Sequence, residues 1–158
     1  MESIKFTSLF KVDKAKLIEL MNCPQVGEHL PLLNGEFTDA DCESFLNSKK
    51  LIWDEYGYGP FAIKINDKFA GWGGFQPEGS DVDFALILHP DFRGWGLKVF
   101  KKFQTIAFEE MNLKSITALL PPSRLNSKAI SRLGFLYDSN VILDGKDFIK
   151  YRLTISSY

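Results

Sequence analysis

The chain has 158 residues, a formal net charge of −1 at pH 7 and 45% hydrophobic residues. These values suit a single domain over residues 1–158 and exclude the strong positive field of a nucleic-acid-binding domain. No apolar run approaches the length of a membrane span, and the N-terminus lacks the regions of a signal peptide. Cys23 and Cys42 have no metal-binding spacing, so we expect reduced thiols, a cytoplasmic protein and no bound metal.

The first part of the chain predicts a strand, a helix and an irregular segment. Residues 4–10 suit a strand, and Asp13 is placed to cap a helix that runs to about Met21. Residues 24–35 contain prolines and glycines, which break regular structure. We therefore expect a loop after this first helix.

Between residues 38 and 76 the pattern changes from helix to strand. Thr38 and Asp41 form a capping box at the start of a second helix. Residues 60–76 predict a hairpin around an Asn-Asp turn. Glycines inside its second strand indicate close backbone packing, a bulge or the approach of a ligand. These glycines are Gly71, Gly73 and Gly74.

The central stretch predicts a strand, a tight glycine loop and a long helix. Residues 83–89 form an apolar run that suits a buried strand, and Pro90 ends it. Gly94 and Gly96 permit backbone angles that other residues resist. From Leu97 onward the apolar residues recur at helical spacing. This stripe contains Val99, Phe100, Phe103, Ile106, Ala107 and Met111.

The charges of this helix are arranged against the helix dipole. Cations are expected near the C-terminal end of a helix and acids near its N-terminal end. Here Lys98, Lys101 and Lys102 crowd the start, whereas Glu109 and Glu110 lie near the end. A bound anion among the glycines would compensate for the arrangement, so the loop predicts an anion site, most naturally for phosphate.

The last third of the chain predicts a strand over residues 115–120, a helix that Ser123 caps, and a hairpin around Asp144-Gly145. The helix is expected to turn four residues inward, namely Leu125, Ala129, Ile130 and Leu133. The complete order is one strand, two helices, three strands, a helix, a strand, a helix and two strands.

Two nucleotide-binding folds fit this order poorly. Residues 94–99 resemble a dinucleotide fingerprint with Val99 in place of its third glycine, and the next strand ends without the acidic residue that binds ribose. No Gly-x-x-x-x-Gly-Lys-Ser/Thr sequence is present, which argues against a P-loop nucleotidase.

Residues 89–97 (HPDFRGWGL), residues 133–135 (LGF) and residues 121–126 between them resemble the GNAT acetyltransferase superfamily. Its loop is commonly Gln/Arg-x-x-Gly-x-Gly/Ala, and both glycines match while Asp91 occupies the first position. The resemblance covers essentially the whole chain. It implies an α/β (mixed α+β) fold with a central mixed, mostly antiparallel sheet of about seven strands and about four helices. A further resemblance, to the branch with ribosomal-protein N-terminal acetyltransferases, rests on residues 22–26, 59–63 and 71–74.

The resemblance also implies the activity. Members move an acetyl group from acetyl-CoA directly to a primary amine, here of a small molecule or a peptide N-terminus, in a monomer or homodimer that uses no metal. The alternative is a non-catalytic module on the same fold that binds or senses acyl-CoA.

The cofactor-binding positions follow from the same resemblance. Main-chain groups of the glycine loop and of the central strand would hold the pyrophosphate and the pantetheine arm. These residues are Leu86, Ile87, Leu88, Arg93, Gly94, Trp95, Gly96, Leu97 and Lys98. Either Ser123 or Asn126 would bind the pantetheine from the following helix, although Ser123 equally suits a plain helix cap.

The catalytic positions are less well matched. Asp83 falls where the family commonly has a glutamate base, and its shorter side chain favours a water relay; a structural role fits equally. Asp81 shares its strand face and is either a second candidate or a solvated strand end. The tyrosine that often protonates the leaving thiolate is replaced by Ile130. Tyr137 is the candidate substitute, unless the acid is absent.

The acceptor remains open. Glu28 and His29 are candidates for acceptor contacts, in a segment expected to border the acceptor pocket. Acidic residues of the first third would favour a cationic acceptor, a hypothesis that rests on Glu28, Glu36, Asp39, Asp41, Asp54 and Glu55.

Overall fold

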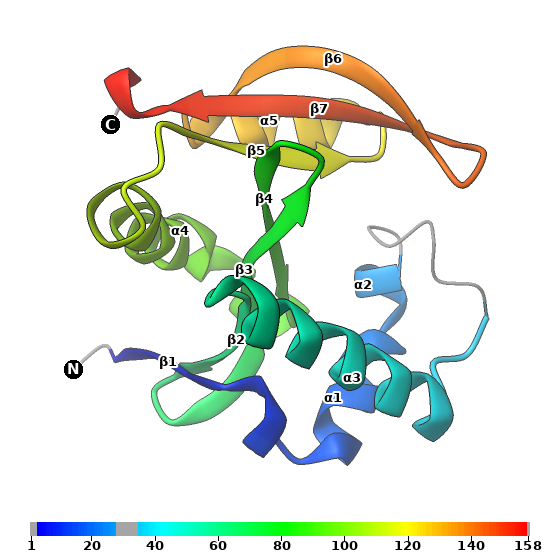
Figure 1. Ribbon diagram of the computed structural model, residues 1–158. Coiled ribbons are helices and arrows are strands. Elements are labelled where there is room, and N and C mark those ends of the chain that lie inside the picture. The colour runs from blue at the N-terminus through cyan, green and yellow to red at the C-terminus, as the bar shows by residue number, and fades with distance from the viewer. Residues whose placement is uncertain (1–2, 28–34, 158) are drawn as a thin grey trace. The chain divides into compact units, whose positions relative to one another are not determined.

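Seven strands hydrogen-bond in the order β1-β2-β3-β4-β5-β7-β6 (Figure 1). The structure, a computed structural model, describes residues 3–27 and 35–157. Strands β4 and β5 pair in parallel, and the β1–β2, β2–β3, β5–β7 and β6–β7 pairs are antiparallel. The predicted mixed, mostly antiparallel sheet of seven strands is therefore confirmed.

The chain divides into two compact units, and the boundary falls within strands β3 and β4. The first unit contains residues 1–76 and 85–94. Its elements, with the two shared strands given in full, are β1 (Ile4–Ser8), a 3-10 turn (Leu9–Lys11), α1 (Lys14–Met21), α2 (Pro24–Gly27), α3 (Asp39–Tyr56), β2 (Pro60–Ile65), β3 (Lys68–Glu78) and β4 (Asp81–Leu88). That residues 1–158 behave as one domain stays a prediction.

The predicted caps form in the first unit. The Asp13 carboxylate accepts a hydrogen bond from the Ala15 main-chain N–H at 3.0 Å and starts α1. The Thr38 hydroxyl accepts from the Asp41 N–H at 3.1 Å, and the Asp41 carboxylate accepts from the Thr38 N–H at 2.9 Å. This reciprocal capping box starts the long helix α3, and Gly57, in the left-handed region, ends it.

Apolar side chains of α1, α3, β2 and β3 form the core of the first unit. Its fully buried members include Leu9, Leu17, Cys42 and Ala62. Trp72 of β3 packs against them, and its indole N–H donates to the Met21 sulfur at 3.5 Å. Ala85 and Ile87 of β4 are half-buried against the same cluster.

The glycines of β3 are explained by the backbone around them. A Cβ on Gly71 would overlap the main-chain oxygen of Ile87 in β4. A Cβ on Gly74 would lie 2.6 Å from the main-chain oxygen of Gly59. Of the three predicted explanations, close backbone packing is observed at both positions. The pairing of β2 with β3 also shifts register beside Gly71, between Ile63 and Lys64, as a bulge would make it do.

The second unit contains residues 77–84 and 95–158. Besides the ends of β3 and β4, its elements are α4 (Gly96–Thr105), a π-helical turn (Ile106–Glu110), β5 (Ser115–Leu120), α5 (Arg124–Arg132), β6 (Leu136–Leu143), β7 (Lys146–Thr154) and a 3-10 turn (Ile155–Ser157). Its core is aromatic: the Phe84 ring lies 5.3 Å from the rings of Phe100 and Phe103, and Phe100 lies 5.5 Å from Phe135.

Three local predictions were wrong. Residues 24–27 form a helical turn, α2, in a segment expected to be irregular; residues 28–34 of that segment lie outside the described chain. The central helix changes to π geometry after Thr105, which buries Phe108. In α5 the residues predicted to face inward include Leu125, which is 78% exposed, and Ala129, also exposed.

The tertiary packing accounts for the last of these errors. Asn126 and Ile130, four residues apart, form the buried face of α5. Because Asn126 is polar, hydrophobic periodicity alone selected its neighbour Leu125 as the buried residue of this face.

Within the described residues, no helix combines the length and apolar character needed to cross a membrane.

Candidate functional site

A 3-10 helix over Pro90–Trp95 leads directly into α4, which begins at Gly96. Trp95 occupies the N-cap position of α4 and makes no side-chain capping hydrogen bond. Its indole carries an N–H donor but no oxygen, so it cannot accept from the first-turn N–H groups. The Trp95 side chain therefore leaves the first turn of α4 uncapped, and this is the end of a helix where an anion is favourable.

The two loop glycines are required by neither backbone conformation nor packing. Neither Gly94 nor Gly96 has a positive φ, so neither uses the unusual backbone angles that glycine permits. A Cβ on either residue would meet no heavy atom of the described chain within 4 Å. This distinguishes them from Gly71 and Gly74, and the space beside them fits the close approach of another molecule to the main chain.

The cations predicted at the start of the central helix lie in its loop and first turn. The helical backbone continues without a break from α4 through the π-helical turn to Glu110, so Glu109 and Glu110 lie at its C-terminal end. Lys98 lies in the first turn, and its ammonium group is 5.1 Å from the centre of the Trp95 ring. Arg93 is exposed just before the helix. The positive charge at the loop thus comes mainly from Arg93 and Lys98.

Strand β4 pairs with β5 through one registered residue pair, Asp83 with Thr117. From Ala85 onward β4 belongs to the first unit, where Leu86, Ile87 and Leu88 are half-buried. These are the residues whose main chain was predicted to bind pantetheine.

Asp83 is buried within the second unit and 3% exposed. Its carboxylate accepts a hydrogen bond from the Thr117 hydroxyl at 2.8 Å, and Thr117 is itself fully buried. The sequence did not single out Thr117, because pairing between β4 and β5 brings together residues 34 apart. A buried carboxylate held in this way is positioned to act through a single water or to fix the two strands.

Asp81 lies in an ion-pair network rather than in a free position. Its two oxygens accept from the Arg152 guanidinium at 2.9 and 3.1 Å, and Lys150 lies 3.4 Å away. Arg152 also donates to Asp138 at 2.9 Å. The hydrogen bond from Arg152 holds the pKa of Asp81 below its usual range. Asp81 therefore suits a clamp between β4 and β7 better than a base.

We expect Asp81→Asn to lower the free energy of unfolding at pH 7 by about 1–2 kcal/mol, since a charge-assisted pair with partial solvent screening is lost. A depressed folded-state pKa gives stability that is present above the unfolded pKa, about 3.9, and is lost as pH falls through the folded value. The wild type should therefore lose more stability than the variant below about pH 4. Urea unfolding at pH 7 and pH 3 measures both effects.

Asp147→Asn, at an exposed position of β7, is the matched control for this experiment. Equal unfolding energies for the wild type and Asp81→Asn at both pH values would contradict the clamp.

The two predicted pantetheine ligands of α5 are bonded to each other and to the preceding loop. The Ser123 hydroxyl accepts from the Asn126 N–H at 3.1 Å, so Ser123 is a helix cap. The Asn126 side chain is 8% exposed, and its amide donates to the Pro121 oxygen at 2.9 Å. Their contact with pantetheine stays a prediction.

Tyr137 is 62% exposed on β6, and its hydroxyl donates to the Asn140 side-chain oxygen at 3.1 Å. Its role as an acid stays a prediction. Glu28 and His29, the candidates for acceptor contact, lie outside the described residues. Of the acidic residues in the first third, Asp41 is used in the capping box, where hydrogen bonds from Thr38 lower its pKa.

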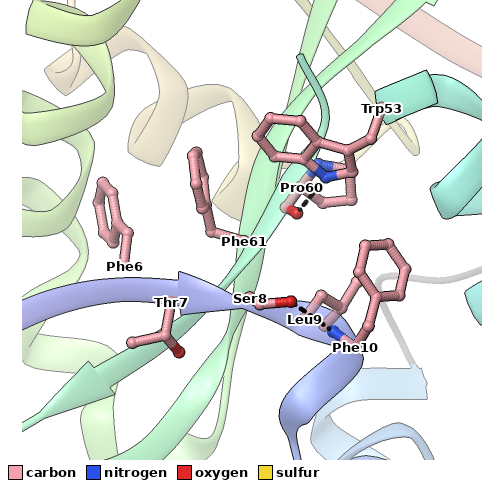
Figure 2. A pocket seen from close by; sticks show the side chains of 8 residues that line it. All are labelled: Phe6, Thr7, Ser8, Leu9, Phe10, Trp53, Pro60 and Phe61. Atoms are coloured by element: carbon pink, nitrogen blue, oxygen red, sulfur yellow. Dashed lines mark hydrogen bonds between the residues drawn. The ribbon is translucent and has the colours of Figure 1, made fainter. Parts of the chain in front are cut away.

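The first unit contains an apolar cavity of about 280 Å³ beside β1 (Figure 2). Figure 2 shows the aromatic side chains of Phe6, Phe10, Trp53 and Phe61 around it, and the Trp53 indole N–H donates to the Pro60 oxygen at 2.9 Å. The lining residues are Phe6, Thr7, Ser8, Leu9, Phe10, Trp53, Pro60 and Phe61. This set contains no predicted cofactor-binding or catalytic residue.

Cys23 and Cys42 are free cysteines, and burial raises the pKa of the Cys42 thiol. Residues 3–27 and 35–157 contain no group of three or more His, Cys, Asp or Glu side chains that could hold a metal ion.

A mixed seven-stranded sheet with a glycine loop leading from a central strand into a helix defines a class of acyltransferases. The family model described as an acetyltransferase (GNAT) domain matches residues 6–135, and the chain belongs to this family of acetyl-CoA-dependent N-acetyltransferases. No curated protein matches the chain significantly.

Solved structures share the fold at low sequence identity. An acetyltransferase from Agrobacterium tumefaciens str. C58 is 18% identical, over 95% of this chain and 90% of that chain, with a TM-score of 0.78. The N-acetyltransferase PseH from Campylobacter jejuni, solved with acetyl coenzyme A, is 16% identical over 97% and 99%, with a TM-score of 0.70. A chimera of the Vibrio cholerae spermidine N-acetyltransferase SpeG with hSSAT is 14% identical over 98% and 97%, with a TM-score of 0.71.

Proposed function

We propose that this protein moves an acetyl group from acetyl-CoA directly to a primary amine of a small molecule or a peptide N-terminus. The observation that carries the proposal is the pair of loop glycines. Gly94 and Gly96 leave space that no neighbouring atom of the described chain fills, beside main-chain donors that the Trp95 side chain cannot cap. The main chain of residues 93–98 is therefore the proposed binding site for the pyrophosphate.

Acetyl-CoA, when bound, supplies the acetyl thioester. The chain's own residues then have two tasks, which are to position the acceptor amine and to take up its proton. Asp83 is the proposed base, and its burial and its bond to Thr117 favour a relay through one water. Attack by the neutral amine forms the amide bond and breaks the carbon–sulfur bond, and the thiolate takes a proton from solvent or from Tyr137.

The acceptor class is a further proposal. The resemblance of residues 22–26, 59–63 and 71–74 to ribosomal-protein N-terminal acetyltransferases supports a peptide N-terminus. Among these residues, however, Asn22 bonds the main chain of Phe37 through both side-chain atoms, at 2.7 and 2.9 Å, and Gly71 is fixed by backbone packing. These residues therefore do not favour a peptide N-terminus over a small amine as the acceptor.

Ligand-dependent stabilisation tests the proposal first. We expect acetyl-CoA and CoA, but not NADH or ATP, to raise the melting temperature. A ligand at about 100 times its Kd adds roughly 2.7 kcal/mol of stability, which corresponds to about 5–10 °C for a chain of this size. Stabilisation by NADH or ATP alone would overturn the proposal. Stabilisation by acetyl-CoA without turnover of any amine in a thiol-release assay would favour the sensor alternative.

A further inference from the structure

We propose that Lys49 forms a subsite for a carboxylate group on the acceptor amine. The inference rests on the proposed transfer function and names the class of acceptor, an amine that also carries a carboxylate. It is drawn from a cluster of Lys49, Phe45, Trp72 and Gln76, all of which belong to the first unit.

The cluster holds a cation between two aromatic rings. Lys49 and Phe45 lie one turn apart on α3, and the Lys49 ammonium is 5.3 Å from the centre of the Phe45 ring and 5.6 Å from that of Trp72. The two rings meet edge to face at 5.1 Å. The lysine stem thus covers Trp72 while its charge remains at the edge of the core.

Within the described part of the chain, one side-chain acceptor bonds the Lys49 ammonium. One N–H donates to the Gln76 side-chain oxygen at 3.1 Å, and an ammonium has three N–H donors. No carboxylate among residues 3–27 and 35–157 lies within ion-pair distance of Lys49. Burial lowers the pKa of Lys49, because no anion compensates for the lost hydration of its charge.

A carboxylate is the group that best completes this arrangement. It would accept the remaining ammonium N–H groups and supply the missing negative charge, and the Gln76 amide nitrogen is a second donor beside them. Lys14 on the same unit differs in this respect, because it is paired with the Glu43 carboxylate.

The position of the cluster relates it to the acceptor side of the reaction. Trp72 belongs to the buried apolar cluster, and Phe45 of α3 packs against this cluster together with Ala85 and Ile87 of β4. Ile87 is one of the three residues whose main chain is proposed to hold the pantetheine arm. An amine whose carboxylate bonds Lys49 would therefore lie on the sheet face shared with Ala85 and Ile87.

The test uses the full chain, with and without CoA, and a series of ω-amino acids from glycine to 6-aminohexanoate. Each amino acid is paired with its primary amide, which keeps the amine and removes the negative charge. NMR signals of the Lys49 side chain, assigned by their loss in Lys49→Met, report binding. We expect the acid of at least one pair to shift these signals, the amide to leave them in place, and Lys49→Met to weaken binding of the acid at least tenfold.

Lys49→Met keeps the apolar stem that covers Trp72, and Lys50→Met, at the exposed neighbouring position, is the matched control. Acetyl transfer from acetyl-CoA is measured on the same pairs. Transfer that is equal for acids and amides, or Lys49 signals that no acid shifts, would overturn the subsite. Shifts with inorganic phosphate alone would overturn the choice of a carboxylate. Acid binding that depends on Lys49 without any transfer would keep the subsite and overturn the transfer function.

Discussion

Gly94→Glu is expected to abolish the stabilisation by acetyl-CoA while the unliganded protein remains folded. The new side chain would enter open space, since a Cβ at this position meets no atom of the described residues within 4 Å, so folding should tolerate it. Its carboxylate would stand beside the N–H groups proposed to hold the pyrophosphate and would repel that group. We expect a loss of affinity of at least 100-fold, equivalent to about 2.7 kcal/mol, measured by calorimetric titration with CoA.

Gly27→Glu is the matched control, because a Cβ on Gly27 also meets no atom within 4 Å among residues 3–27 and 35–157, and Gly27 has no positive φ. It should bind CoA as the wild type does. Gly96→Ala makes a second comparison. Because Gly96 has no positive φ, alanine should stabilise the unliganded protein by about 0.4–1 kcal/mol, which a slightly higher melting temperature would show. The added methyl group should still weaken CoA binding. CoA binding at wild-type affinity in Gly94→Glu would remove the loop from the proposed site.

The second large effect is expected at Asp83. Asp83→Asn keeps the shape of the side chain and an oxygen that accepts from Thr117, but it removes the proposed base. Removing a positioned base typically lowers turnover by about 10²–10⁴-fold. We therefore expect kcat to fall in this range, while calorimetric Kd values for CoA stay within threefold, an allowance of about 0.65 kcal/mol.

Thr117→Val separates catalysis from structure. If Asp83 only joins β4 to β5, Thr117→Val, which removes the hydrogen-bond donor, should lower the melting temperature more than Asp83→Asn, which keeps the acceptor. Both variants should then leave kcat near the wild-type value, and this result would exclude Asp83 as the base. If Asp83 is the base, Thr117→Val should retain most of the kcat of the folded wild-type protein, but the pH dependence of kcat should change.

The features of the fold that could be predicted from sequence depend on neighbouring residues. Thr38 with Asp41, Asp13, and the Asn66-Asp67 turn act within a few residues of chain, and all three form as expected. The π-helical turn after Thr105 and the exposed Leu125 depend on which faces the rest of the chain covers. Local periodicity contains no information about those contacts, which explains why both were missed.

The same distinction applies to the candidate site. The loop at residues 93–98 could be identified because its residues are consecutive. Lys49 and Gln76 lie 27 residues apart, and their contact becomes visible only when α3 packs on β3. Asp83 was singled out, but its partner Thr117 and the ion pairs of Asp81 with Arg152 were not, since each requires two strands to meet.

The close packing of β3 against β4 has a consequence for how this chain can diverge during evolution. Gly71 cannot gain a side chain without moving the main chain of Ile87, so selection for folding alone should hold this position fixed. The backbone contact between β3 and β4 at Gly71 should therefore stay the same even when the acceptor specificity of the protein changes. Diversity in specificity is then expected at side chains that can change without moving this backbone, such as Lys49 on α3.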